Sequence, residues 1–420
     1  MKLLRTLIAA TALTFSAGTA FAETELVVGY PYPDLFESVF NKIKKDFEAA
    51  NPGIKVKFEG AYKNYEDATQ RVLRQSLTDQ LPDISFQGIN RLRVFVERNL
   101  VQPIDAHMAG DASWADHGVP AAMQSIGRSG GKTYGMPFAV STPVIMFNKD
   151  LVKKAGGDPE NFPKTWDGIL DLSKKINALG PKTYGMHYVW QVTGNWMWQV
   201  LITSQCGQIL DKSEKKVNFN NATGLKALTL LRRMVDEGDM PDLSLGDAYN
   251  SMYAGGLGML ISSVAGLGNI ERKGKGKFHA GAALFPEVKA NCGRVPGGGN
   301  LAMIFTKDKK RQEAAWKFIK HAVSASGQTH QAGTTGYMPT NSKVLDDNKY
   351  MKKFYDTHPA HKTTLQQMNY ITTWYAFPGK NALKITDVIK NSLQSVVNKS
   401  ATPKEALEEM SKNVAKLLPK

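Results

Sequence analysis

Aromatic rings and neutral polar groups occur in clusters in this sequence. They are the side chains that could bind a ligand by stacking and hydrogen bonding. A sugar-like ligand requires this combination, because its CH face stacks on rings while its hydroxyls hydrogen-bond to amides and backbone groups. The alternative is that the rings fill the hydrophobic core, where large aromatic side chains are mostly buried. The rings lie in three segments, which hold Tyr30 and Tyr32, then Trp190, Trp196 and Trp198, and finally Tyr370, Trp374, Tyr375 and Phe377.

Signatures of catalysis and of metal binding are missing from the sequence. It contains no H-E-x-x-H, no phosphate-loop lysine motif and no paired cysteines at metal spacing. His358 and His361 are the closest of the eight histidines, but no further ligands stand at standard spacing, so we expect no metal and no cofactor. A glycan hydrolase would need two carboxylates about 5 to 10 Å apart. It stays as an alternative, with Asp83, Glu97 and Asp105 as its candidates.

The elements that would position a ligand-binding site alternate between strands and helices. Apolar periodicity predicts them in turn at residues 25–30, 35–50, 54–58, 65–79 and 83–86. This alternation predicts an α/β fold with a mainly parallel sheet and helices on both faces. Ligands of such sheets bind beyond the carboxyl ends of the strands. The residues just after Val28 and Phe86 are therefore candidates for binding.

The length of the chain predicts two lobes. Without the export signal described below, 398 of the 420 residues remain, which is beyond the size at which one core stops growing. Extended segments that could cross between lobes lie at residues 135–148, 280–286 and 336–339. We therefore expect crossings near residues 140, 283 and 335. The predicted N-terminal lobe comprises residues 23–139 and 284–333, and the C-terminal lobe residues 140–283 and 334–420.

The first 22 residues predict export. Lys2 and Arg5 precede an apolar run at residues 7–15, and an A-x-A site follows, so we expect cleavage after Ala22. The run is too short to span a bilayer, and no cysteine stands at the cleavage point to carry a lipid anchor. A periplasmic protein is predicted. Its two cysteines, at positions 206 and 292, can pair in that compartment, but their spacing leaves the bridge open.

The positive charge of the chain is scattered. The formal charge of +15 becomes +13 once Lys2 and Arg5 leave with the signal. The single dense basic cluster, at residues 272–277, is short and glycine-spaced like a surface loop. Since charge runs are usually solvated surface, we expect no nucleic-acid partner. Steering of an anionic ligand is the alternative interpretation.

Five segments carry a resemblance to a known family. They read LPDISFQGIN (81–90), YGMPFAVSTPVIMFNKDLVKKAGGDPENFPKTWDGI (134–169), MYAGGLGMLISSV (252–264), GGGNLAMIF (297–305) and TGYMPTN (335–341). Together they resemble the extracellular solute-binding proteins of ABC importers, in the group of the maltose-binding and glycerol-3-phosphate-binding receptors. The resemblance implies a two-lobed periplasmic-binding-protein fold of type II. Each lobe would be a mixed, mainly parallel sheet flanked by helices, with the ligand cleft between the lobes.

The resemblance also implies ligand-binding residues from both lobes. The family pattern places Gln87 and Asn90 on the ligand after the third predicted strand, and Ser141 and Thr142 at the first crossing. Further positions that match the family's binding residues are Tyr65, Trp190, Trp196, Ser262, Ser263, Gly298, Gly299, Asn300 and Tyr337. The aromatic groups described above add Tyr30 and Trp374 to the candidates.

One position departs from the glycerol-3-phosphate receptors, which the sequence resembles more than the maltose receptors. Those receptors place an arginine on the phosphate from a late helix, where this chain has Thr386, with Lys380 and Lys384 nearby. A phosphate favours the bidentate partner that a guanidinium provides. The expected ligand is therefore a neutral sugar or a polyol ester with other charge partners, and the choice between them stays open.

The resemblance implies capture of the ligand by closure of the lobes. A ligand that contacts both lobes favours the closed form and shifts the population towards it. The closed protein, expected to be a monomer, would then dock on the membrane permease of an ABC importer. A secreted binding module outside transport, such as a carrier of ligand to a chemoreceptor, fits the same cleft and is the other alternative.

Overall fold

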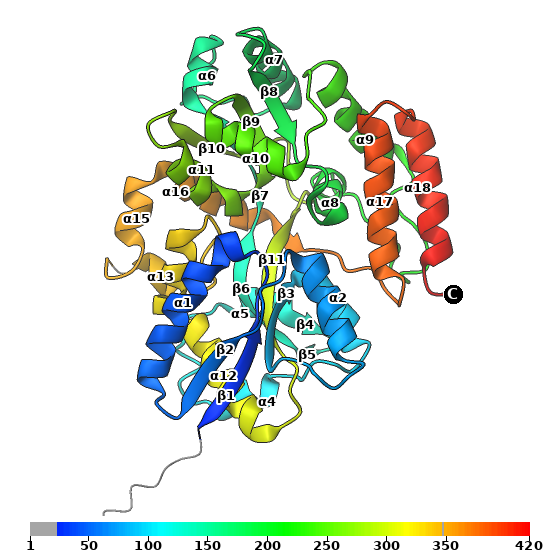
Figure 1. Cartoon of the computed structure of the whole chain (residues 1–420). Coiled ribbons are helices and arrows are strands. Elements are labelled where there is room, and N and C mark those ends of the chain that lie inside the picture. Colours follow the sequence, from blue (N-terminus) through cyan, green and yellow to red (C-terminus); the bar gives the residue numbers. More distant parts are fainter. Residues whose placement is uncertain (1–22, 347) are drawn as a thin grey trace, which may run out of the picture.

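The chain folds into two lobes, each built on a β-sheet with helices packed against it (Figure 1). The computed structural model describes residues 23–346 and 348–420. The predicted export signal and its cleavage point lie outside the described residues. Among the described residues, no helix has the length and apolar character needed to cross a bilayer.

The first lobe is built on a sheet in the order β12-β11-β3-β1-β2, with β6 paired to β11. Its strands are β1 (Thr24–Gly29), β2 (Ile54–Phe58), β3 (Ile84–Gly88), β6 (Gly135–Ser141), β11 (Val295–Ile304) and β12 (Ile371–Thr373). β1 pairs in parallel with β2 and β3, whereas β11 runs antiparallel to β3 and β6. A parallel amino-terminal unit and a strand that returns from the second lobe thus form one mixed sheet.

Helix α1 (Pro33–Ala50) covers one face of this sheet because its apolar residues recur at helical spacing. Its buried residues are Phe36, Val39, Phe40, Ile43 and Phe47. The ring centroid of Phe40 lies 4.5 Å from that of Phe86 in β3. The next strand residue, Gln87, points to the opposite face and bonds to Thr69 of α2 (Tyr65–Gln75). Helices α12 (Lys309–Ala322) and α13 (Ala325–Thr334) pack beside α1.

The second lobe is built on a sheet in the order β10-β7-β9-β8. Its strands are β7 (Pro143–Asn148), β8 (Tyr184–Tyr188), β9 (Leu257–Ser263) and β10 (Ala280–Leu284). The predicted mixed sheet is present, but here β7 is antiparallel to both β9 and β10, and only β8 and β9 pair in parallel. The reason is topological, because the chain enters this lobe through β7 and returns through β10, so the two strands run in opposite directions.

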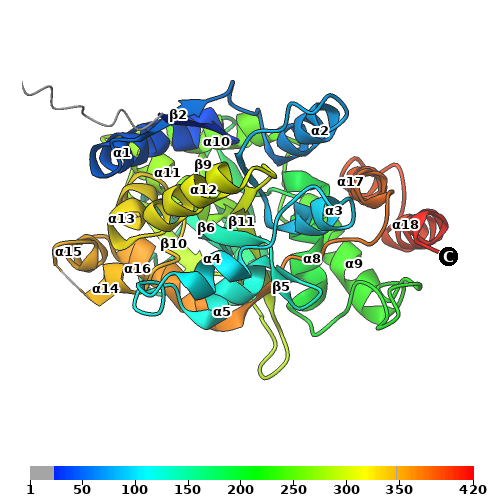
Figure 2. The ribbon, with the colours of Figure 1, turned by 90° about the horizontal axis from the view of Figure 1, so that it is seen from below.

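Helices surround the second sheet and extend the lobe to one side. They are α6 (Lys149–Lys154), α7 (Trp166–Asn177), α8 (Trp196–Thr203), α9 (Ala222–Asp236), α10 (Leu245–Ala254), α11 (Leu267–Gly274) and α16 (Pro359–Leu365). The last two helices, α17 (Ala382–Val397) and α18 (Pro403–Leu417), pack on each other and on α9, at the edge of the molecule in Figures 1 and 2.

Short elements complete the first lobe and its link to the second. They are α3 (Leu92–Val96), α4 (Asp105–Gly110), α5 (Ala121–Gln124), the pair β4 (Arg128–Ser129) and β5 (Lys132–Thr133), α14 (Lys343–Asp346) and α15 (Lys352–Thr357). Five of them, α3, α4, α5, β4 and β5, lie between β3 and β6 in the sequence.

The first two crossings connect the sheets directly. β6 belongs to the first sheet and β7 to the second, and Thr142 stands between them. The chain returns between the end of β10 at Leu284 and the start of β11 at Val295. These breaks lie close to the crossings expected near residues 140 and 283.

The third crossing differs from the expectation. Met338 pairs with Val140 of β6, and Asn341 and Ser342 bond to the backbone of His117 and Gly118 in the first lobe. Residues 338–346 therefore stay beside the first sheet. The chain joins the second lobe at α16, which packs on β10. The long-range bonds of Asn341 decide this placement, and they leave no trace in the local sequence pattern.

A disulfide joins Cys206, just after α8, to Cys292 in the second crossing, with their Cα atoms 5.2 Å apart. Two backbone hydrogen bonds hold the same crossing to the residues after α8: Lys289 N donates to Ser204 O, and Arg294 N donates to Thr203 O, each over 2.9 Å. The bridge that the spacing left open is therefore formed, and it fastens the crossing to the second lobe.

Candidate functional site

Tyrosine and asparagine side chains of the first lobe meet where the two lobes join. The hydroxyls of Tyr65, at the start of α2, and Tyr337 lie 3.2 Å apart. Asn300 of β11 donates a hydrogen bond from Nδ2 to the Tyr65 hydroxyl over 3.2 Å. The ring of Tyr32 packs edge-on against that of Tyr65, with centroids 5.0 Å apart. The fold thus brings Tyr65 together with two residues far along the chain, Asn300 at a separation of 235 positions and Tyr337 at a separation of 272.

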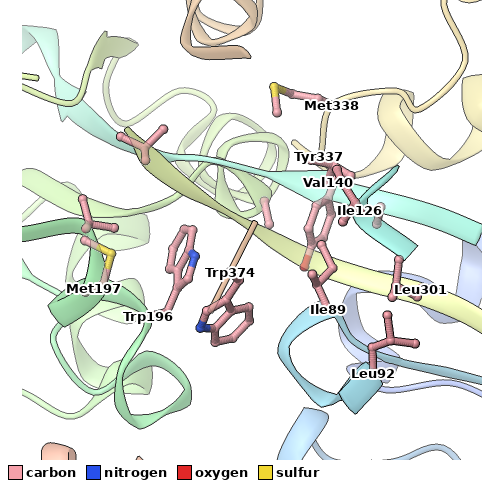
Figure 3. Packing of buried hydrophobic residues seen from close by; sticks show 14 of the residues in the cluster. Ile89, Leu92, Ile126, Val140, Trp196, Met197, Leu301, Tyr337, Met338 and Trp374 are labelled. Carbon is pink, nitrogen blue, oxygen red and sulfur yellow. The ribbon is translucent and has the colours of Figure 1, made fainter. Parts of the chain in front are cut away.

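Two tryptophans lie next to the beginning of β11. Trp196, the first residue of α8, donates its indole N–H to the carbonyl of Pro296 over 3.0 Å. Its ring centroid lies 6.2 Å from that of Trp374, which directly follows β12. Figure 3 shows the two indoles close together beside the strand. Both side chains are buried, so this pair is a fixed apolar wall rather than two mobile surface rings.

Tyr249 brings the second lobe to the tyrosines of the first. Its hydroxyl on α10 lies 3.4 Å from that of Ser262 on β9, and it acts electrostatically on Tyr337. We call the resulting set of residues the interlobe cluster. It comprises Tyr32, Tyr65, Trp196, Tyr249, Ser262, Asn300, Tyr337 and Trp374.

Burial keeps the tyrosine hydroxyls of the interlobe cluster protonated. Loss of water around Tyr65 and Tyr337 raises the pKa of both well above the usual value, and burial also raises the pKa of Tyr249. A neutral phenol both donates and accepts hydrogen bonds. The cluster therefore offers groups that match sugar hydroxyls in either role.

Two glycines of β11, Gly298 and Gly299, allow neighbouring residues to pack closely against the strand. A Cβ on Gly298 would lie 2.8 Å from Ser141 Oγ and 3.0 Å from the Trp196 ring. Gly299 has φ +111°, and a Cβ there would lie 1.9 Å from the carbonyl oxygen of Ala139. Only glycine combines that backbone angle with so close a neighbour. The predicted triple-glycine turn thus forms part of the strand that lines the site.

Buried polar atoms around the interlobe cluster lack hydrogen-bond partners among the described residues. Asn90 lies beside Tyr65 at Gly88, Thr142 follows Ser141, and Trp190 follows β8. Each unpaired buried group costs about 1 to 3 kcal/mol, so a ligand that pairs with them gains that energy. The atoms are Asn90 Oδ1, Thr142 Oγ1, Trp190 Nε1, Asn300 Oδ1 and Trp374 Nε1.

The structure places three predicted site residues in other roles. Tyr30 packs in the core, with its ring 4.7 Å from Phe40. Gln87 bonds to Ser85 and to α2 on the sheet face away from α1. Ser263 accepts the N–H of Ala265 and so caps the short helical turn that follows β9. Side chains alternate along a strand, so an ungapped match by position does not tell which face a residue occupies.

Four residues near the site were not predicted from the sequence. Tyr32 and Tyr249 belong to the interlobe cluster, and Glu66 and Arg91 form an ion pair beside it. Each of the last two directly follows a predicted residue in the sequence, Tyr65 and Asn90 respectively. Adjacency to a candidate at the end of a strand or the start of a helix is the signal that could have found them.

The late helix supplies no cation to the interlobe cluster within the described part of the chain. Thr386 is buried in α17, where its hydroxyl bonds to Ala382 O and its methyl group faces Gly194. Lys380 and Lys384 are exposed. The lysines that could have replaced the expected arginine therefore point to solvent.

The carboxylates considered for hydrolysis have separate structural roles. Asp83 accepts the Val27 N–H and pairs with Arg311, Glu97 pairs with Arg93, and Asp105 accepts the Thr133 N–H. None of these contacts links two of the three carboxylates. Each of the three thus has a structural partner of its own.

The histidine pair also has structural contacts. His361 bonds to Glu271 over 2.9 Å, and His358 stacks on Phe354 with ring centroids 4.1 Å apart. No group of three or more potential metal ligands is present among residues 23–346 and 348–420.

The model of the bacterial extracellular solute-binding proteins matches residues 42–363, more than half of the chain. The chain belongs to this family. The resemblance stated from the sequence motifs is confirmed, and the members of the family are binding proteins.

Relatives of this solute-binding protein include receptors for a phosphorylated polyol. The sn-glycerol-3-phosphate-binding periplasmic protein UgpB of Shigella flexneri is 29% identical over 293 residues, which are 66% of this chain and 65% of that protein. The chain thus matches just under two thirds of that relative's length. A binding protein of Brucella abortus is 25% identical over 91% of this chain and 90% of its own.

Solved structures share the fold of this solute-binding protein. UgpB from Mycobacterium tuberculosis in complex with glycerophosphocholine has a TM-score of 0.81 at 18% identity, covering 93% of this chain and 97% of that one. Maltose-bound MalE3 of T. maritima has a TM-score of 0.79 at 18% identity, covering 94% and 100%. The predicted two-lobed α/β fold is confirmed.

Proposed function

We propose that this protein is the periplasmic substrate-binding component of an ABC importer. It captures a sugar, a polyol or a phosphate ester of one of them between its lobes and delivers it to a membrane permease as a monomer. The observation that carries the proposal is the interlobe cluster, in which both lobes present rings, hydroxyls and unpaired polar atoms to the same region. Family membership and the ligands named for similar receptors support it.

The rings and polar atoms suit a polyhydroxyl compound. The indoles of Trp196 and Trp374 provide an apolar wall for the CH face of a sugar. Amide oxygens of Asn90 and Asn300 accept hydrogen bonds from hydroxyls, and the Trp374 N–H donates one. The cluster thus supplies both partners that a sugar-like ligand requires.

Closure of the lobes is the proposed mechanism of capture. Arg93 of α3 in the first lobe pairs with Glu214, in the segment between α8 and α9, over 2.7 Å. Glu214 also accepts the hydroxyl of Tyr375 over 2.8 Å. These contacts join the lobes beside the ligand site and break when the lobes separate. A ligand held by both lobes therefore favours the form in which they are made.

A thermal-shift screen tests the proposal. The purified protein is heated with neutral sugars, polyols, sugar phosphates and glycerophosphodiesters. A ligand at 100 times its dissociation constant stabilises the folded form by about 2.7 kcal/mol, so a true ligand raises the melting temperature. If no member of the panel raises it, the proposed function is wrong.

A matched pair of variants locates the site. Trp374→Phe removes an unpaired indole N–H in the interlobe cluster, and we expect binding of the ligand found in the screen to weaken about tenfold. Trp198→Phe removes another unpaired indole N–H, but that ring packs against Phe219 between α8 and the segment before α9. We expect its affinity to stay unchanged. Equal effects in the two variants would contradict the site.

A further inference from the structure

A buried ion pair stands beside the interlobe cluster. Arg91 donates a hydrogen bond from Nη2 to Glu66 Oε1 over 2.8 Å. The Arg91 side chain is 2% exposed and that of Glu66 32% exposed. A charge so deeply buried is costly unless it is paired and hydrogen-bonded. The pair is therefore fixed in place, and Glu66 is its more accessible member.

Adjacency in the chain and electrostatics link this ion pair to the ligand site. Glu66 follows Tyr65 at the start of α2, and Arg91 follows Asn90 after β3. Burial raises the pKa of the Tyr32 hydroxyl well above its usual value; Glu66 raises it further, and Arg91 opposes the rise. Both charges thus act on a ring of the interlobe cluster.

One guanidinium hydrogen-bond donor of the pair is still available. Arg91 Nε is buried and has no partner within the described residues. The guanidinium only donates hydrogen bonds and the carboxylate only accepts them. A pair of neighbouring sugar hydroxyls, each able to donate and accept, matches this combination.

The two charges beside the interlobe cluster have opposite signs. Glu66 and Arg91 shift the pKa of Tyr32 in opposite directions. Lys380 and Lys384 are exposed, and position 386 is a threonine. Neither these two lysines nor position 386 therefore brings a cation to this site.

We propose that Glu66 and Arg91 are specificity-determining residues that select an uncharged polyol, such as a sugar, over its phosphate ester. This inference rests on the proposed function and narrows its ligand. A phosphate monoester carries a charge of about −1.5 to −2 at neutral pH. Placed on Arg91, it would lie beside the Glu66 carboxylate in a largely buried site, where water screens the repulsion between like charges less.

The first test compares each neutral compound with its own phosphate ester. Glucose and glucose 6-phosphate, glycerol and glycerol 3-phosphate, and maltose are titrated into the unmodified protein by calorimetry, together with the wider panel described above. Binding restricted to neutral members supports the inference. Tighter binding of a phosphate ester overturns it but leaves the proposed function standing, whereas binding of no compound overturns both.

The second test changes the preference between neutral compounds and phosphate esters by substitution of Glu66. Glu66→Gln keeps the shape of the side chain but leaves Arg91 without its counter-charge, so we expect phosphate esters to bind about tenfold tighter than before. Glu237→Gln is the control, because Glu237 pairs with Arg233 on the exposed face of α9. An unchanged preference in Glu66→Gln overturns the inference.

A third variant keeps the test decisive if Glu66→Gln fails to fold. Arg91→Lys retains the positive charge but loses the planar fork of donors, so we expect the neutral ligand to bind about tenfold more weakly and the melting curve to stay cooperative. Arg233→Lys, in the exposed pair, is the control. Unchanged affinity in Arg91→Lys contradicts a role for the pair in ligand selection.

Discussion

The disulfide between Cys206 and Cys292 yields a prediction whose size follows from the chain itself. The two cysteines are 86 positions apart. In the chain-entropy description, closing a loop of that length lowers the entropy of the unfolded state by an amount worth about 4.6 kcal/mol at room temperature. We therefore expect Cys206→Ser/Cys292→Ser to reduce the free energy of unfolding by about that amount.

The folded geometry should survive this change, because hydrogen bonds from Lys289 and Arg294 hold the same crossing to the second lobe. Urea unfolding followed by circular dichroism measures the stability, and calorimetry measures ligand binding. The unmodified protein treated with reductant is the parallel sample and should match the double variant. A loss below about 1 kcal/mol would refute the loop-entropy reasoning, and a loss of binding would show that the bond also shapes the site.

Three further predictions concern pH, lobe closure and the backbone of β11. Burial lowers the pKa of His187 from 6.5 to about 4, so the fold favours its neutral form and acid destabilises the protein. We expect the free energy of unfolding to fall by about 2 to 3 kcal/mol between about pH 7.5 and about pH 4.5, and this loss to be absent from His187→Gln in urea titrations at each pH. Arg93→Ala and Glu214→Ala should each weaken ligand binding about threefold. The double variant should lose less than the sum of the two, because the contact between them is shared, while Arg93 also pairs with Glu97 and Glu214 also holds Tyr375. Fully additive losses in calorimetry would contradict this. Gly299→Ala should lower the free energy of unfolding by about 3 kcal/mol, as measured by thermal unfolding. Gly297→Ala is the control, because its Cβ would meet its nearest neighbour at 3.4 Å, and it should lower that energy by under about 1 kcal/mol. Equal effects would argue against backbone strain at Gly299.

Elements whose pattern is local were predicted well. The expected helix at residues 35–50 is α1 (Pro33–Ala50), and the expected strand at 54–58 is β2 (Ile54–Phe58). Their apolar residues recur at the period of the element, so neighbours in the sequence carry the information. The expected helix at 65–79 ends earlier, at Gln75, where backbone bonds to Arg74 and Val72 begin a turn.

Side-chain direction and long-range contacts could not be predicted in the same way. Tyr30 and Tyr32 are two positions apart, yet one packs in the core and the other on Tyr65. The difference arises because Tyr32 has φ +53° and begins α1 in a left-handed conformation that turns the chain. The contact between Asn341 and His117 spans 224 positions and likewise has no local signal.

β11 gives the molecule a mechanical property. Its first residues, Val295 to Gly297, pair with β12, while residues from Gly298 onward pair with β6 and those from Asn300 also with β3. The change of partners falls within the run of three glycines, which have no side chains to restrict the backbone angles. A torque between the lobes would concentrate its bending there, next to Asn300 and the Trp196 ring. Under the proposed function, a ligand held by those side chains would lie at the bend itself, and its shape would set the angle between the lobes.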